Sequence, residues 1–123
     1  MMPQTYTDAD IDALVQTFIQ NAQDQESAML EFDTKRLNML ILKMRDIKES
    51  LGAMPGDRRN ALLPLLQHRN HQVRLRAAMA TLTIAPEAAR ATLEGLARVQ
   101  HTPQAADARH CLMGIDEGWF KPS

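Results

Sequence analysis

Residues 61–96, ALLPLLQHRNHQVRLRAAMATLTIAPEAARATLEGL, decide the fold of this chain. The stretch predicts three successive helices: one that ends near residue 68, a second that begins at His71, and a third entered through Pro86. Apolar residues recur along one face of the second helix. They are Val73, Ala77, Ala78 and Leu82. The two small alanines would let a neighbouring helix approach closely, so this stretch predicts packed helices.

The composition favours helices over strands in the whole chain. Hydrophobic residues make up 45% of the 123 residues but aromatic residues only 4%, and strand formers of the aromatic and β-branched types are scarce. A chain of this length can bury a core of its own. We therefore expect a single all-α domain over residues 1–123, with an N-terminal helix pair at 8–51 and further helices at 57–118.

Periodicity and capping signals predict about six helices. They are expected at about 8–30, 33–51, 57–68, 71–84, 86–99 and 103–117. Thr7, Asn70 and Thr102 are residues of the type that cap helix N-termini. Pro64 falls inside the third helix, where it removes a hydrogen-bond donor and clashes with the preceding turn. A bend is therefore expected there.

The order of short motifs resembles helical-repeat proteins. LLPLL at 62–66 resembles the first helix of a HEAT repeat, and Val73-Arg74 followed by Ala77-Ala78 and Leu82 resembles the second. TKRLNML with Asn38, then LLPLL, VR, AA and PEAA, is similar to a family of small bacterial proteins known as a domain of unknown function. That resemblance covers residues 8–118 and implies a short HEAT-like α-solenoid, with the first two helices capping one end. It implies no catalytic residue.

Charge is divided unevenly along the chain. Residues 1–33 carry seven acids and no Lys or Arg, whereas the remaining residues carry all 14 bases against eight acids. Acidic helices suit a basic partner, although a solvated face without function would look the same. We hypothesise a non-enzymatic protein-binding module and, by analogy with small bacterial proteins of similar build, an immunity protein that neutralises a basic toxin domain. The candidate contact residues are Asp12, Asp24, Glu26, Glu31, Asp33 and Met39, the last as an apolar anchor.

A second hypothesis is nucleic-acid association through a basic patch. Arginines cluster around the predicted turn between residues 57–68 and 71–84, and such a patch would bind phosphates. They are Arg58, Arg59, Arg69 and Arg76. An isoelectric point of about 6.4, the acidic first helix and the shortage of aromatic residues count against it. The HEAT resemblance implies that Arg74 braces the adjoining turn through hydrogen bonds to carbonyl groups or an aspartate.

No residue pattern predicts a metal site, a cofactor or catalysis. His68 and His71 flank one turn, His101 lies in the next, and His110 adjoins Cys111, so three or four ligands do not converge. Cys111 lies on the apolar stripe of the last helix, where a cysteine is inert. The loop GAMPG lacks the lysine and hydroxyl residue of a phosphate-binding loop. We expect no enzyme.

The termini and the cysteine content indicate a cytoplasmic protein. A single cysteine excludes an internal disulfide and fits a reducing compartment. The N-terminus carries acids from position 8 and no Lys or Arg before Lys35, unlike a secretory signal. No apolar run approaches the roughly 20 residues that span a bilayer. The pattern leaves the oligomeric state open.

Overall fold

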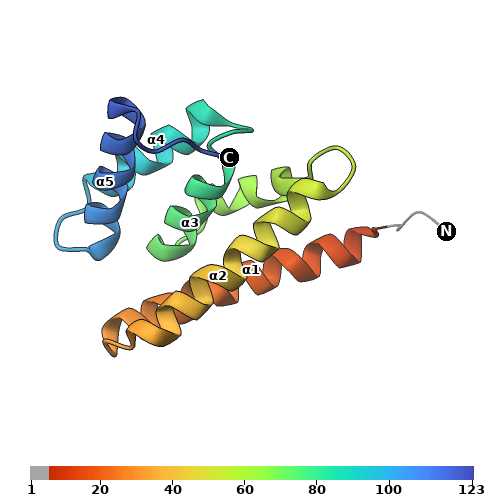
Figure 1. The fold of residues 1–123 in the computed structure, drawn as a ribbon, viewed down its shortest axis with the longest axis horizontal. Helices are drawn as coiled ribbons and strands as arrows, with labels where there is room; N and C mark the ends of the chain where they lie inside the picture. The colour runs from red at the N-terminus through yellow and green to blue at the C-terminus, as the bar shows by residue number, and fades with distance from the viewer. Residues whose placement is uncertain (1–5) are drawn as a thin grey trace. The chain divides into compact units, whose positions relative to one another are not determined.

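The computed structural model describes residues 6–123, which form six helices and no strand (Figure 1). The helices are α1 (Asp8–Leu30), α2 (Thr34–Ala53), the 3-10 helix η1 (Arg58–Gln67), α3 (His71–Thr81), α4 (Pro86–Ala97) and α5 (Pro103–Glu117). The expected all-α fold is confirmed. The chain divides into two compact units, unit 1 up to Ala61 and unit 2 from Leu62 onward.

In unit 1, α1 and α2 pack side by side in opposite directions (Figure 1). A capping box starts α1: Thr7 Oγ1 accepts from the backbone N–H of Asp10 at 3.1 Å, and the Asp10 carboxylate accepts from Thr7 N–H at 2.9 Å. Asp33 caps α2 with a single bond, in which its carboxylate accepts from Arg36 N–H at 3.1 Å. These local bonds explain why both helices begin within one residue of the predicted positions.

A polar network crosses the buried interface between α1 and α2. Asn21 donates to the Leu40 carbonyl at 2.9 Å, and Gln25 donates to Asn21 Oδ1 at 2.8 Å. Gln25 also lies 3.4 Å from the sulfur of Met44. Phe18 is fully buried one turn before Asn21. Because buried amides are costly unless hydrogen-bonded, this network fixes the register of α1 against α2.

In unit 2, α3 packs against α4 and α5, and α4 packs against α5. Asn70 caps α3 by accepting from Val73 N–H at 3.0 Å, and Thr102 caps α5 by accepting from Ala105 N–H at 3.1 Å. Both caps are as predicted. Seven apolar side chains of α3, α4 and α5 are 0% exposed: Val73, Leu75, Ala77, Ala78, Ala89, Leu93 and Ala108. The alanines of α3 therefore lie in the core, which agrees with the predicted close approach of a neighbouring helix.

The α-helix predicted at 57–68 is wrong in type. Arg58–Gln67 form a 3-10 helix with Pro64 inside it. At its two ends Asn60 N–H bonds to the Asp57 carbonyl and His68 N–H to the Leu65 carbonyl, three residues back in each case. Pro64 cannot donate and clashes with an α-helical turn before it, which favours the more tightly wound 3-10 helix.

Candidate functional site

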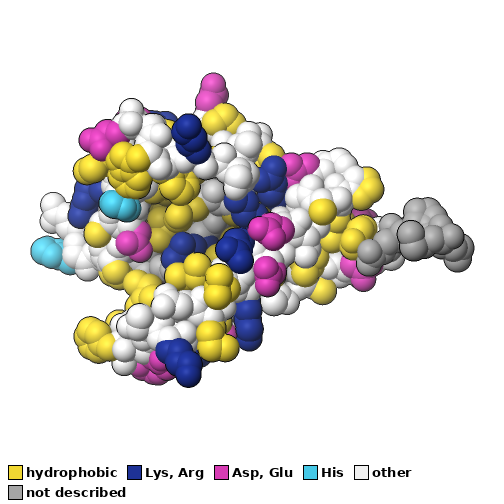
Figure 2. All heavy atoms as spheres, in the orientation of Figure 1, with side chains coloured by type: hydrophobic (Ala, Val, Ile, Leu, Met, Phe, Trp, Pro, Cys, Tyr) yellow, Lys and Arg dark blue, Asp and Glu magenta, His cyan; other side chains and the backbone are white. Residues whose placement is uncertain are grey.

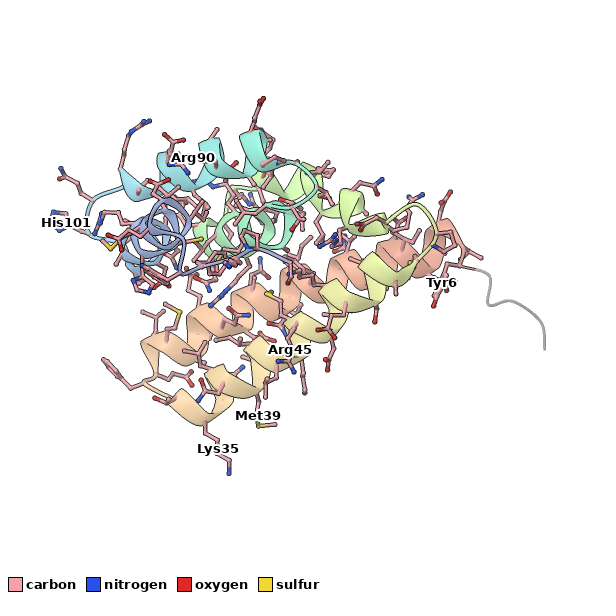
Figure 3. All side chains as sticks on the ribbon, turned by 45° about the horizontal axis from the view of Figure 1, so that its top comes forward. Tyr6, Lys35, Met39, Arg45, Arg90 and His101 are labelled. Atoms are coloured by element: carbon pink, nitrogen blue, oxygen red, sulfur yellow. The ribbon has the colours of Figure 1, made fainter. Side chains whose placement is uncertain are left out.

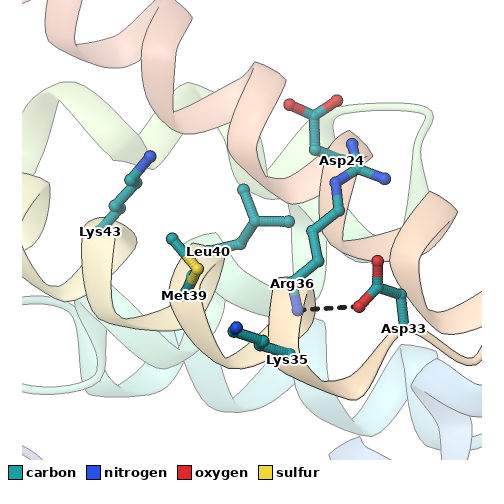
Figure 4. Close-up of a pocket in the computed structure, with 7 residues that line it drawn as sticks. All are labelled: Asp24, Asp33, Lys35, Arg36, Met39, Leu40 and Lys43. Atoms are coloured by element: carbon teal, nitrogen blue, oxygen red, sulfur yellow. Dashed lines mark hydrogen bonds between the residues drawn. The ribbon is translucent and has the colours of Figure 1, made fainter.

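A hollow of about 310 Å³ lies on unit 1 near the turn that joins α1 to α2 (Figure 4). It is lined by Asp24, Asp33, Lys35, Arg36, Met39, Leu40 and Lys43. Met39 and Leu40 supply the apolar part of its surface, and charged groups of both signs surround them. Lys35 and Met39 point away from the α2 ribbon in Figure 3. We call this the α1–α2 hollow.

The acids in and beside the α1–α2 hollow already have partners. Asp33 accepts from Arg36 N–H, the bond drawn in Figure 4, and Asp24 accepts from Gln20 Nε2 at 3.0 Å. Glu31 lies 3.8 Å from the Arg36 guanidinium, with both side chains exposed. An exposed pair of this kind contributes at most about 1 kcal/mol to stability. These carboxylates therefore remain accessible to a partner at little cost.

The six predicted contact residues do not form one patch. Asp24, Asp33 and Met39 line the hollow, and Glu31 adjoins it through Arg36. Helical geometry places Asp12 about 18 Å along α1 from Asp24 and turned by about 120°, and it turns Glu26 about 160° from Asp24. Acidic residues prevail on α1, which carries five acids and no base, whereas α2 carries five bases and two acids.

Two exposed apolar residues that the sequence pattern did not predict lie at the end of α1 and in the turn that follows it. Leu30 is 76% exposed and Phe32 is 91% exposed; hydrophobic side chains gather at this end of unit 1 in Figure 2. Phe32 has φ 56°, in the left-handed region. The turn is held by Phe32 N–H to Met29 O at 3.2 Å and Asp33 N–H to Ala28 O at 2.9 Å. The sequence signal that could have revealed this exposed residue is the position of Phe32 between the end of one helix and the N-cap Asp33 of the next, where the core cannot cover an aromatic side chain.

Met39 and Leu42 also lie at the surface of unit 1, each 51% exposed. Apolar residues that lie off the inner stripe of a helix either contact a second neighbouring helix or form an exposed patch. Their exposure favours the patch. Met39 therefore joins Leu30 and Phe32 as an apolar side chain that a partner could cover.

The arginines of the alternative basic patch are divided between the units. Arg59 bonds the Asp57 carboxylate through Nε at 2.9 Å and Nη2 at 2.6 Å, which raises the pKa of Arg59 and lowers that of Asp57. Arg58 Nε is buried without a hydrogen-bond partner in the described residues. Arg69 is exposed and Arg76 half-buried, both in unit 2. Neither unit by itself assembles the four into a phosphate-binding surface.

The predicted brace by Arg74 is wrong. Its Nε is buried and has no hydrogen-bond partner among residues 6–123. The turn before α3 is held instead by His68, whose Nδ1 accepts from Asn70 N–H at 3.0 Å. An arginine whose buried Nε makes no hydrogen bond acts there through packing of its stem. His68 thus has a structural task.

The described part of the chain shows no arrangement typical of metal or thiol chemistry. Within residues 6–123 no three His, Cys, Asp or Glu side chains come together in a way that could hold a metal ion. Cys111 is 4% exposed, as its place on the apolar stripe predicted, and burial raises the pKa of its thiol. A raised pKa leaves little reactive thiolate. Across the same residues, every helix is too short or too polar to cross a bilayer.

Comparison with known proteins identifies the family. Residues 12–116 match the family described as "Domain of unknown function (DUF2019)". The chain belongs to this family. The crystal structure of the protein RPA1889 from Rhodopseudomonas palustris CGA009 is similar, with 42% sequence identity and a TM-score of 0.87 over 92% of this chain and 93% of that chain. A search of curated proteins gave no match.

Membership of the DUF2019 family confirms the expected likeness to a domain of unknown function. The likeness to RPA1889 extends over nearly the whole of both chains, so the fold is shared along with the sequence. Neither name states an activity or a partner. We therefore infer function from the geometry of the described residues.

Proposed function

We propose that this protein is a non-enzymatic protein-binding module that docks a basic domain of another protein on α1 and the α1–α2 turn. The observation that carries the proposal is Phe32, an aromatic side chain 91% exposed on a backbone with φ 56°. Glycine or asparagine would suit this backbone better. Burial of a Phe side chain in an interface contributes about 1.5–3 kcal/mol, which gives a reason for its presence.

The surroundings of Phe32 resemble the anatomy of a protein interface. Leu30 and Met39 are further exposed apolar residues of the same hairpin, and the α1–α2 hollow adds charged groups around Met39. Interfaces of this type have an apolar centre with aromatic anchors and a charged rim. This arrangement supports docking of a folded surface rather than of a small molecule.

The charge of α1 argues for a basic partner. Asp12, Asp24 and Glu26 contribute to a helix with five acids and no base, and Glu31 and Asp33 extend the acidic run into the turn. Opposite charges at the rim speed association and select the partner. The bases of α2 would repel a basic surface, so we place the charged contacts on α1 and the turn, and α2 contributes only the apolar side chain of Met39.

The most specific form of the proposal is a cytoplasmic immunity protein that neutralises a cognate toxin domain. Its support is the acidic α1 and the analogy with small bacterial proteins of similar build. A HEAT-like relation between η1 and α3, and a short solenoid capped by the first two helices, belong to the same proposal. Such helical scaffolds present broad faces to other proteins. Nucleic-acid association is the competing outcome.

The test is capture of the partner with matched variants. The immobilised chain is compared with Phe32→Asn, which suits φ > 0, and with His101→Asn, whose parent residue is exposed with φ 64° in the α4–α5 turn. We expect wild type and His101→Asn to retain one basic protein, identified by mass spectrometry, and Phe32→Asn to bind it at least about tenfold more weakly.

Charge reversal provides the second arm. Asp12→Lys and Glu31→Lys should slow association with the basic protein, whereas Glu87→Lys on α4 should not. Equal binding by wild type and Phe32→Asn would overturn the proposal. So would binding of nucleic acid that weakens steeply with salt, since that result would assign the partner to the arginines.

A further inference from the structure

A second hollow, of about 250 Å³, lies within unit 2. Its walls come from α3, α5 and the segment that follows α5. The side chains that matter here are Arg76, Met79, Asp107, His110, Trp119 and Phe120. None belongs to the α1–α2 hollow, so this site is independent of the proposed docking surface. We call it the unit 2 hollow.

The aromatic wall of the unit 2 hollow is built by the chain folding back on α5. Gly118 ends the helix with φ 82°, and Phe120 N–H then bonds to the Gly114 carbonyl at 3.0 Å. The Trp119 ring lies 4.9 Å from the His110 ring, centroid to centroid, with the planes tilted by 51°. Trp119 Nε1 donates to a Glu117 carboxylate oxygen at 2.8 Å. These contacts fix the position of the indole.

Opposite charges flank the apolar part of this hollow. Arg76 on α3 is half-buried, and one guanidinium nitrogen lies 3.8 Å from the Met79 sulfur. Burial lowers the pKa of Arg76, and the exposed carboxylate of Asp107 on α5 counteracts this in part. A guanidinium in such surroundings gains from an additional carboxylate, because partial burial strengthens charge pairing.

We propose that the unit 2 hollow binds a small amino-acid-like zwitterion with an apolar or aromatic side chain. The carboxylate would meet the guanidinium of Arg76 and the ammonium group would meet the carboxylate of Asp107. The side chain would pack on Met79, Trp119 and Phe120. Ligand pockets usually enclose about 300–1,000 Å³, so a hollow slightly below this range suits a molecule the size of one residue.

We chose a zwitterionic ligand because the hollow carries both a positive charge, on Arg76, and a negative charge, on Asp107. A simple carboxylate would pair with Arg76 but leave Asp107 as a repulsive neighbour, and a simple amine would have the reverse problem. A zwitterion places an opposite charge at each group. The aromatic wall adds dispersion and a favourable face for the ammonium group.

Intrinsic fluorescence tests the proposal because Trp119 is the single tryptophan in the chain. L-Phenylalanine, which does not absorb at the excitation wavelength of tryptophan, is the probe. Two analogues each lack one charge: L-phenylalaninamide lacks the carboxylate and 3-phenylpropionate lacks the ammonium group. We expect a saturable change in Trp119 fluorescence with L-phenylalanine, and we expect each analogue to bind at least about tenfold more weakly.

Variants of two exposed acids provide the control. Asp107→Asn should weaken the binding of L-phenylalanine about tenfold and leave the binding of 3-phenylpropionate unchanged or make it tighter. Glu87→Gln on α4 should change the affinity for neither probe. The proposal is overturned by the absence of a saturable change up to about 10 mM, a concentration that detects binding of about 3 kcal/mol. It is also overturned if all three probes bind alike or if Asp107→Asn behaves as Glu87→Gln does.

Discussion

The side-chain amide of Gln104 donates to Oε1 of Gln72 at 2.9 Å and joins α5 to α3 inside unit 2. Gln72 is fully buried and Gln104 is 2% exposed. The two residues are 32 positions apart in the sequence. A bond of this kind in an apolar interior specifies how two helices meet, because any other register would bury amide groups without this bond.

Gln104→Ala should therefore destabilise the protein by about 1–3 kcal/mol, the usual cost of leaving a buried polar partner with a lost bond. Urea denaturation followed by circular dichroism measures the free energy of unfolding. Replacing both residues, in Gln72→Leu/Gln104→Leu, should cost less than the sum of the single replacements, because no amide is then left buried. Gln67→Ala, at an exposed position, serves as the control. An unchanged free energy in Gln104→Ala would contradict the role given to this bond.

Phe32 predicts a separation of stability from binding. Its φ of 56° is unfavourable for an aromatic residue. Phe32→Asn should therefore raise the free energy of unfolding by up to about 1 kcal/mol, while partner binding weakens at least about tenfold. Phe32→Val should instead lower it by about 1 kcal/mol, because a β-branched residue fits this region poorly. Thermal denaturation of the two variants checks the order. A less stable Asn variant would show that Phe32 serves the fold rather than recognition.

Much of the helix pattern was accessible from sequence because helix caps are local. The cap side chains of Thr7, Asn70 and Thr102 bond to a backbone group three residues away, so residue type and spacing suffice to predict them. Pro64 indicated that the α-helix around it would be distorted, but the sequence could not distinguish a bent α-helix from a 3-10 helix. That choice depends on how the surrounding side chains pack.

The hydrogen bonds of the buried amides could not be predicted from the sequence, because they join residues far apart in the chain. Asn21 and Gln25 are polar residues of α1 whose partners on α2 lie 19 residues away, beyond the reach of a local sequence pattern. The candidate site was predicted in part, because the acids of α1 are visible in the sequence. The acids of α1 point in different directions because each residue of an α-helix is rotated about 100° from the one before it. The bases that share the hollow with Asp24 come from α2. Only the packed hairpin brings the two signs together.

The ion pair between α4 and α5 predicts an acid-dependent contribution to stability. Arg90 donates to the Asp116 carboxylate at 3.0 Å, and this bond lowers the pKa of Asp116 below its ordinary 3.8. The folded state then holds the proton less tightly than the unfolded state, so the pair stabilises above pH 3.8 and the contribution is lost as pH falls through the lowered pKa. Both groups are exposed, so the contribution is small and screened by salt.

Denaturation at a series of pH values measures this contribution. Asp116→Asn should be less stable than wild type near neutral pH, and the difference should vanish as pH falls through the lowered pKa. Arg90→Gln should show the same loss, and the double variant should be no worse than either single one if the pair acts as a unit. A difference between Asp116→Asn and wild type that persists in acid would assign the effect to packing instead.

The close fit of the C-terminal segment over α5 predicts opposite outcomes for two helical glycines. A Cβ on Gly114 would lie 2.7 Å from Phe120 Cβ and 2.9 Å from the Trp119 ring, whereas a Cβ on Gly95 would meet nothing within 4 Å. Gly114→Ala should therefore displace the segment and cost about 1–3 kcal/mol through overpacking. Gly95→Ala, on the exposed face of α4, should stabilise the protein by about 0.5–1 kcal/mol, since alanine is a better residue than glycine in a helix interior.

Tryptophan emission distinguishes a local from a global effect of these variants. The emission should shift in folded Gly114→Ala, where the indole loses its contacts, and stay unchanged in Gly95→Ala. Equal stability and equal emission for both variants would show that the segment is not held against Gly114, and the aromatic wall of the unit 2 hollow would fail with it.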